Sequence, residues 1–140
     1  MITALDISSS ALTAQRTRLT AIANNIANLS TTHNEAGEPQ AYQPRYTIFE
    51  TDETVRGPYG SAGVKVGSVQ IADVEPRWKY QPGHPDAMKQ GPHTGYVAYP
   101  NIDLMSEFTD ALETTRAYEA NLGVIDATKE MVQQTLRILA

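Results

Sequence analysis

The uneven placement of turn-forming residues constrains this fold more than any other feature of the sequence. All eight prolines and eight of the nine glycines lie between residues 33 and 100, and only Gly123 lies outside this stretch. Proline lacks the backbone N–H that a helix interior needs, so long helices are possible only on either side of it. We therefore expect a helical segment over residues 1–32, a turn-rich middle over residues 33–100 and a second helical segment over residues 101–140.

A seven-residue repeat of apolar residues runs through the N-terminal segment. The repeat consists of Leu5, Leu12, Leu19 and Ile26, with Ile22 as an added position three residues after Leu19. Leucine and isoleucine at this spacing are typical of a coiled-coil seam. Residues 1–32 carry only three charged side chains, whereas a solvated helix face normally carries charge. We therefore expect much of this helix to contact other protein.

The C-terminal segment has the longest repeat in the chain. Its seven-residue series is Leu104, Ala111, Tyr118, Ile125, Val132 and Leu139, and Phe108, Leu122 and Leu136 follow members of the series by four residues. Asn101 or Asp103 can cap the helix after Pro100. A helix of roughly 36 to 38 residues would be about 55 Å long, more than a compact domain of this size needs, so we expect it to project.

The middle segment is predicted to form short β-strands over residues 42–50 and 63–75, and Trp78 and Tyr80 continue the pattern. The apolar alternation changes phase between Val66 and Val69, which indicates a bulge near Gly67 and Ser68. Residues 57–63 are then a hairpin loop, since they lack the Lys-Ser/Thr pair of a phosphate-binding loop. So few large apolar residues make a marginal core, which would gain from packing on the helices or on a neighbouring molecule.

These patterns predict an α+β fold. The long N- and C-terminal helices pair as a coiled coil, and a small β-rich domain is inserted between them. Two helices from opposite ends of the chain can bury their apolar stripes against each other only if the termini come together. The under-charged second face of the N-terminal helix predicts further helix neighbours.

Composition and charge exclude several classes of function. The net charge of −5 and the lack of a basic cluster argue against nucleic acid as a partner. The absence of cysteine excludes disulfides and thiolate chemistry. No apolar run is long enough to span a bilayer, so we expect a protein that is not membrane-embedded. The N-terminal residues lack the basic and apolar regions of an ordinary secretory signal.

No catalytic, cofactor-binding or metal-binding residues are predicted. The three histidines lie in turn-rich stretches, and we expect Pro85 to keep the side chains of His84 and Asp86 from converging on a metal. Acidic residues of the C-terminal segment alternate with arginine and lysine as on a solvated helix face. The alternative from this class is a metal-dependent hydrolase built on His84, Asp86 and His93, which metal analysis would test.

Three asparagines close together are unusual in a helix, because asparagine has a low helix propensity. Asn24, Asn25 and Asn28 fit two interpretations. In one, they mark a fraying helix end with Asn28 near the C-cap. In the other, their side chains form hydrogen bonds to neighbouring helices and fix the register.

Motifs at both ends of the chain resemble those of bacterial flagellar rod and hook proteins. At the N-terminus these are residues 9–16 (SSALTAQR) and 21–28 (AIANNIAN), followed by Thr31 and Thr32. At the C-terminus they are residues 100–104 (PNIDL) and 116–121 (RAYEAN). The short length is similar to that of the proximal rod members, since the distal rod and hook members are much longer.

The middle of the chain also resembles the proximal rod members of this family. The matching segments are residues 63–66 (GVKV), 80–87 (YQPGHPDA) and 95–100 (GYVAYP). Residues 88–94 (MKQGPHT) depart from the family, which typically has a short acidic connection there. This departure affects the local loop and whatever it contacts.

The resemblance implies a structural subunit of the proximal rod of the flagellar basal body, which polymerises into a helical tube and transmits motor torque to the hook. It implies export through the flagellar type III apparatus without a cleaved signal, and a location in the rod across the periplasmic space. The implied partners are copies of itself, other rod proteins and the MS-ring and export-apparatus side of the basal body, with no small-molecule substrate. The alternative is a coiled-coil adaptor that does not polymerise.

The residues expected at the self-assembly interface are those of the two apolar repeats together with the three asparagines. They are Leu5, Leu12, Leu19, Ile22, Asn24, Asn25, Ile26, Asn28, Leu104, Phe108, Tyr118, Leu122, Ile125, Val132, Leu136 and Leu139.

Overall fold

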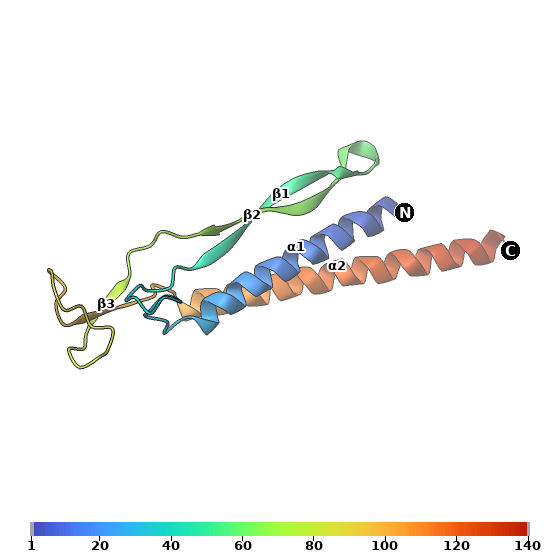
Figure 1. The fold of residues 1–140 in the computed structure, drawn as a ribbon. Helices are drawn as coiled ribbons and strands as arrows, with labels where there is room; N and C mark the ends of the chain where they lie inside the picture. Colours follow the sequence, from blue (N-terminus) through green and yellow to red (C-terminus); the bar gives the residue numbers. More distant parts are fainter. Residues whose placement is uncertain (1, 140) are drawn as a thin grey trace.

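The computed structural model describes residues 2–139, apart from the side chains of Ile2, Pro58 and Leu139. Two long helices, α1 (Ile2–Ala27) and α2 (Leu104–Leu139), lie side by side and run in opposite directions (Figure 1). Small antiparallel sheets lie between them in the sequence, so the α+β prediction is confirmed. Both ends of the chain lie toward the same end of the elongated molecule, and α2 extends past the start of α1 (Figure 1).

Helix α2 begins where the sequence predicts. The carboxylate of Asp103 accepts hydrogen bonds from the backbone N–H of Met105 at 3.3 Å and from the hydroxyl of Ser106 at 2.7 Å. The bond from Met105 satisfies a backbone donor at the helix start that has no partner within the helix, and the bond from Ser106 holds the Asp103 side chain in place. The 36 residues of α2 then continue to Leu139, in agreement with the expected length.

Helix α1 ends at Ala27, earlier than the boundary predicted near Thr32. The amide of Asn28 donates a hydrogen bond to the carbonyl of Asn24 at 2.8 Å, and the hydroxyl of Thr31 donates one to Oδ1 of Asn28 at 3.0 Å. Asparagine and threonine side chains compete in this way with the backbone bonds of a helix. Asn28 therefore lies near the C-cap, as one interpretation of the asparagine cluster expected.

The first sheet is a long hairpin of β1 (Arg45–Arg56) and β2 (Ala62–Ile71), joined by a short 3₁₀ turn over Pro58–Gly60. Ile48 pairs with Ser68 and Phe49 pairs with Val66, so Gly67 is left out of the register. This is the predicted bulge. The strands differ in extent from the prediction, since β1 continues to Arg56 and β2 stops at Ile71.

A second two-stranded sheet joins β3 (Arg77–Tyr80) to β4 (Tyr96–Tyr99) at the opposite end of the molecule from the termini (Figure 1). Strand β4 was not predicted from the sequence. Val97 of β4 is fully buried and pairs with Lys79 of β3. The middle of the chain thus consists of two separate small sheets.

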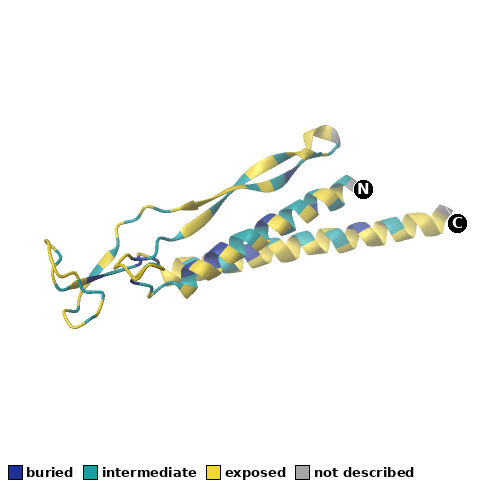
Figure 2. Cartoon of the chain, viewed as in Figure 1, coloured by how far each residue is buried: buried dark blue, intermediate teal, exposed yellow. Residues whose placement is uncertain are grey.

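Helix α1 forms the central layer, with the β1–β2 hairpin on one side and α2 on the other (Figure 1). The hydroxyl of Ser10 on α1 accepts a hydrogen bond from the backbone N–H of Val64 at 3.1 Å. A Cβ at the neighbouring Gly63 would lie 2.8 Å from the Ser10 hydroxyl oxygen, so glycine permits this close approach. Small residues dominate the α1 core, in which Ala14, Ala21 and Ile22 are buried (Figure 2).

Candidate assembly surface

The buried positions of α2 that lie against α1 are small and polar rather than apolar. Thr114 is fully buried and Thr128 is 4% exposed, and each hydroxyl donates a hydrogen bond to a carbonyl of its own helix, to Asp110 and Val124 respectively. A threonine hydroxyl satisfied in this way can be buried at little cost. Helix α1 therefore covers a face of α2 that the seven-residue repeat did not single out.

The apolar repeat of α2 is left largely uncovered by the rest of the chain. Its exposed members are Leu104, Phe108, Tyr118, Leu122 and Leu136, with exposed fractions between 36% and 61%. At about 100° per residue, they lie about 40° to 120° around the helix axis from Thr114 and still farther from Thr128, the positions that α1 covers. We call these five residues the α2 stripe.

Two other members of the repeat, Ile125 and Val132, are half-buried at the edge of the stripe that is nearer to α1. On α1, Ile22 is buried while Leu5, Leu12, Leu19 and Ile26 are half-buried. The expected full burial of one repeat against the other is therefore absent within one subunit. Leu139, the last predicted interface residue, lies outside the described side chains.

The exposed apolar surface of α2 is wider than the repeat predicted. Met105, Leu112 and Ile138 are 71%, 62% and 84% exposed. They do not belong to the seven-residue series that begins at Leu104, so the repeat did not predict them as interface residues. Large apolar side chains on a long helix were the feature of the sequence that could have indicated them. The C-terminal turns of α2 lie beyond the start of α1 and have no neighbouring element there (Figure 1).

Asn25 is the polar centre of the region where α1, α2 and the hairpin meet. It is 3% exposed, and its amide donates to the carbonyl of Arg45 at 2.8 Å and to Oε1 of Glu107 at 3.1 Å. Its Oδ1 accepts from the N–H of Arg45 at 2.8 Å and from the hydroxyl of Tyr42 at 3.2 Å. The bond to Glu107 is the expected hydrogen bond to a neighbouring helix. Asn24, in contrast, is exposed.

The electrostatics of this region follow from its burial. Burial raises the pKa of Glu107, the hydrogen bond from Asn25 lowers it, and the nearby Asp110 raises it again. Arg18 of α1 and Asp110 of α2 form an ion pair at 3.5 Å that is partly exposed. Such a pair contributes little to stability, so the amide of Asn25 is the stronger polar link between the helices.

The histidines are arranged differently from the prediction. Nδ1 of His84 lies 3.8 Å from Oδ2 of Asp86 despite the intervening proline, and Nδ1 of His33 lies 3.4 Å from the same oxygen. The expectation that these side chains would not converge was wrong, because the turn after β3 folds back on itself through a hydrogen bond from the N–H of Asp86 to Nδ1 of His84 at 3.2 Å.

His93 lies apart from the cluster of His33, His84 and Asp86, and its ring is stacked on Trp78 with ring centroids 4.1 Å apart.

The hydroxyl of Thr32 donates a hydrogen bond to Asp86 that lowers the pKa of this carboxylate, and the nearby imidazoles of His33 and His84 lower it further. Among the described residues, no three histidine, aspartate or glutamate side chains are arranged to hold a metal ion. The cluster instead ties the segment after α1 to the loop before β4.

Comparison with known proteins assigns the chain to a family. Residues 5–33 match the family described as flagella basal body rod protein, and residues 93–138 match the C-terminal family of flagellar basal body rod FlgEFG proteins. The flagellar basal-body rod protein FlgC of Borreliella burgdorferi is 36% identical, over 99% of this chain and 97% of its own length. The chain belongs to the FlgC family of rod proteins.

Other FlgC proteins agree with this assignment. That of Bacillus subtilis is 35% identical over 96% of this chain and 95% of its own, and that of Salmonella typhimurium is 33% identical over 99% and 97%. The two family matches cover most of α1 and α2. The second match includes the α2 stripe. As a FlgC family member, the protein is a structural rod subunit.

Two further observations concern this FlgC family member. No helix in the described residues combines the length and apolar character needed to cross a bilayer. The segment 88–94 is held at both ends, because the N–H of Met88 donates to the carbonyl of Tyr96 and the N–H of Gly95 donates to the carbonyl of Met88, each at 2.9 Å.

Proposed function

We propose that this subunit belongs to the proximal rod and polymerises head to tail into an open helical tube that transmits motor torque toward the hook. Contacts between different surfaces of identical subunits generate such open assemblies when they do not close into a ring. Long helices that contact several neighbours in parallel suit the transmission of torque. The role is structural, and no enzymatic step is assigned.

The observation that carries this proposal is the uncovered α2 stripe. Large exposed apolar patches on soluble proteins mark interaction sites, and this one follows the length of a helix whose Thr114 and Thr128 face is already covered by α1. We assign the stripe to helix–helix contacts with other subunits, in which the apolar repeats of α1 and α2 complete coiled-coil packing. Ile125, Val132 and the half-buried repeat of α1 would form the edges of these contacts.

The remaining partners follow the family resemblance. We assign contacts with other rod proteins and with the MS-ring and export-apparatus side of the basal body, a location in the periplasmic space and export through the flagellar type III system. The apolar character of the N-terminal helix, with few charges to repel a neighbour, supports its placement inside such an assembly.

The test is a charge placed in the α2 stripe. Leu122→Asp puts a carboxylate on a side chain that is 45% exposed in the subunit, so we expect the stability of the monomer to change by less than about 1 kcal/mol. In an assembled rod the same carboxylate would be buried without a partner, at a cost of several kcal/mol. We therefore expect normal expression and folding, but no rod assembly and no motility.

The matched control is Ala120→Asp, which adds the same charge two residues away, about 160° around the helix axis from Leu122 at about 100° per residue, where Ala120 is exposed. This variant should assemble. Light scattering of the purified protein separates an adaptor, which keeps a fixed size as concentration rises, from a polymerising subunit. Functional rods built from Leu122→Asp would refute the assignment of the α2 stripe.

A further inference from the structure

The loop after β3, residues 81–87 (QPGHPDA), is bonded to the β3–β4 sheet, and we call it the arm. The N–H of Gln81 donates to the carbonyl of Gly95 at 2.9 Å, and Oε1 of Gln81 accepts from the hydroxyl of Tyr99 at 2.9 Å. Further along the arm, the N–H of His84 donates to the carbonyl of Gln81 at 3.0 Å. These bonds fix the position of the arm relative to the sheet.

Asp86 lies near the end of the arm, and its carboxylate contacts the segment that follows α1. Oδ2 of Asp86 accepts a hydrogen bond from the hydroxyl of Thr32 at 2.5 Å and lies 3.4 Å from Nδ1 of His33. Thr32 is 6% exposed, so its hydroxyl would be buried without this partner if the bond were lost. The side chain of Asp86 is itself only 17% exposed, which limits competition from water.

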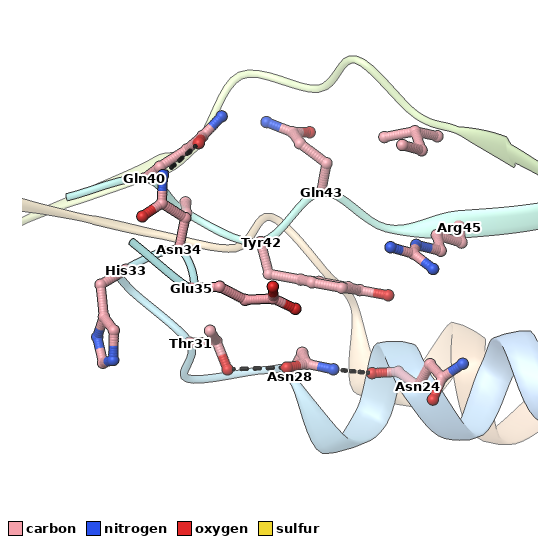
Figure 3. Close-up of a pocket in the computed structure, with 12 residues that line it drawn as sticks. Asn24, Asn28, Thr31, His33, Asn34, Glu35, Gln40, Tyr42, Gln43 and Arg45 are labelled. Atoms are coloured by element: carbon pink, nitrogen blue, oxygen red, sulfur yellow. Dashed lines mark hydrogen bonds between the residues drawn. The ribbon is translucent and has the colours of Figure 1, made fainter. Parts of the chain in front are cut away.

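The segment after α1 is held to the end of that helix by its own hydrogen bonds (Figure 3). The hydroxyl of Thr31 donates to Oδ1 of Asn28 at 3.0 Å, and the carbonyl of Thr31 accepts from the N–H of Tyr42 at 3.2 Å. The bond between Thr32 and Asp86 therefore joins two parts of the subunit that are each internally fixed.

The β3–β4 sheet has little else that could fix its angle to the helices. Within the described residues, α1 contacts α2 and both strands of the hairpin, whereas β3 and β4 contact mainly each other. The hydrogen bonds and ion pairs that leave residues 77–99 in this part of the chain all involve Asp86. Val97 of β4 and the following Pro100 are buried, but apolar burial has no preferred direction.

Two chain connections, residues 72–76 and residues 100–103, join the sheet to the hairpin and to α2. The connections lie together, because the amide of Asn101 donates a hydrogen bond to the carbonyl of Glu75 at 3.2 Å. Two adjacent connections act as a single pivot and leave the sheet free to rotate about it. A contact beyond the far end of β3 is needed to fix the angle, and Asp86 supplies that contact.

We propose that Asp86 is a latch for the β3–β4 sheet. While its carboxylate accepts the hydrogen bond from Thr32, the sheet is held at one angle to the helices, and when this bond opens the sheet rotates about the pivot. The latch gives the arm a conformational role that goes beyond the proposed assembly function. It does not depend on the α2 stripe, so either assignment can fail without the other.

Distances between spin labels measure the angle of the sheet, and the absence of cysteine from the sequence allows labels at chosen positions. Lys79→Cys on β3 and Glu113→Cys on α2 place one label at an exposed residue on each side of the pivot. In the purified full chain, pulsed electron spin resonance should give a narrow distance distribution for this pair.

Variants of the latch should change this distribution. Asp86→Ala or Thr32→Val removes a hydrogen bond to a carboxylate, so either should raise the population outside the narrow distribution about tenfold or more. Thr32→Ser keeps the hydroxyl and should keep the distribution narrow. This rescue separates loss of the bond from a general effect of altering position 32.

The control pair is Arg16→Cys on α1 with Glu113→Cys on α2, two exposed positions within the helices. Its distances should stay the same in every latch variant, which distinguishes rotation of the sheet from loosening of the whole subunit. The latch would be overturned by a broad distribution for the Lys79 and Glu113 pair before any latch substitution, or by an unchanged one after Asp86→Ala. Equal broadening of the control pair, or a broad distribution in Thr32→Ser, would overturn it as well.

Discussion

Replacing Asn25 by alanine tests whether one amide joins the three layers of the subunit. The side chain donates two hydrogen bonds and accepts two, and these connect α1 to the start of β1, to Tyr42 and to Glu107 of α2. Alanine removes all four bonds and leaves their partners in place. Within the described residues, Asn25 is the one residue of α1 whose side chain forms hydrogen bonds to both the hairpin and α2.

The magnitude follows from the burial of the partners. A hydrogen bond contributes about 1 kcal/mol net, and a buried group left without a partner costs about 1–3 kcal/mol. Arg45 is exposed, so water can replace part of what its backbone loses, whereas Glu107 and Tyr42 are half-buried. We expect Asn25→Ala to lower the free energy of unfolding by about 3 kcal/mol, a large fraction of the roughly 5–15 kcal/mol typical of a domain.

Urea unfolding of the purified monomer, followed by circular dichroism, measures this change. The control is Asn24→Ala, since Asn24 is the adjacent residue of the same type, is exposed, and makes no side-chain hydrogen bond in the described part of the chain. Its effect should stay within about 0.5 kcal/mol. Equal effects of the two substitutions, or a loss below about 1 kcal/mol for Asn25→Ala, would show that the amide network does not hold the layers together.

Two predictions concern carboxylates with shifted pKa values. Burial places the pKa of Glu107 above its unfolded value, so its contribution to stability is present below about pH 4 and is lost as the pH rises through the folded pKa. Glu107→Gln should raise the urea midpoint at pH 7 and flatten its pH dependence, and an unchanged profile would contradict this. Hydrogen bonds from Ser106 and Met105 lower the pKa of Asp103, so its contribution is present above about pH 4 and is lost as the pH falls. Asp103→Ala should speed amide exchange at Met105 near neutral pH while Asp103→Asn preserves protection, and equal exchange in both variants would argue against the cap.

Local features of the fold were predictable because they depend on local chemistry. The placement of proline and glycine located the two helices, although α1 ends at Ala27 and not near Thr32, and Asp103 was one of two recognisable caps for α2. The phase change around Gly67 indicated the bulge that the strand register contains. The motifs at both ends were sufficient to indicate the family that the comparisons show.

Other features depend on contacts between distant residues. Strand β4 forms because Tyr96–Tyr99 finds β3 as a partner, and its four residues carried no strong strand pattern alone. His84 approaches Asp86 because a turn reverses the chain, which residue spacing did not reveal. Glu107 was unremarkable in sequence and became a half-buried partner of Asn25 only through the contact between the helices.

The candidate assembly surface shows the same division. The sequence alone determined which residues of α2 are apolar and that they repeat every seven residues, since both are properties of composition and spacing. Only the tertiary structure decided which face α1 covers. Helix α1 lies over Thr114 and Thr128, whose hydroxyls are satisfied by their own helix, and Leu122 and its neighbours in the stripe are left exposed. The physical reason is that a helix face is chosen by the fit between two surfaces, and one helix in isolation does not contain that information.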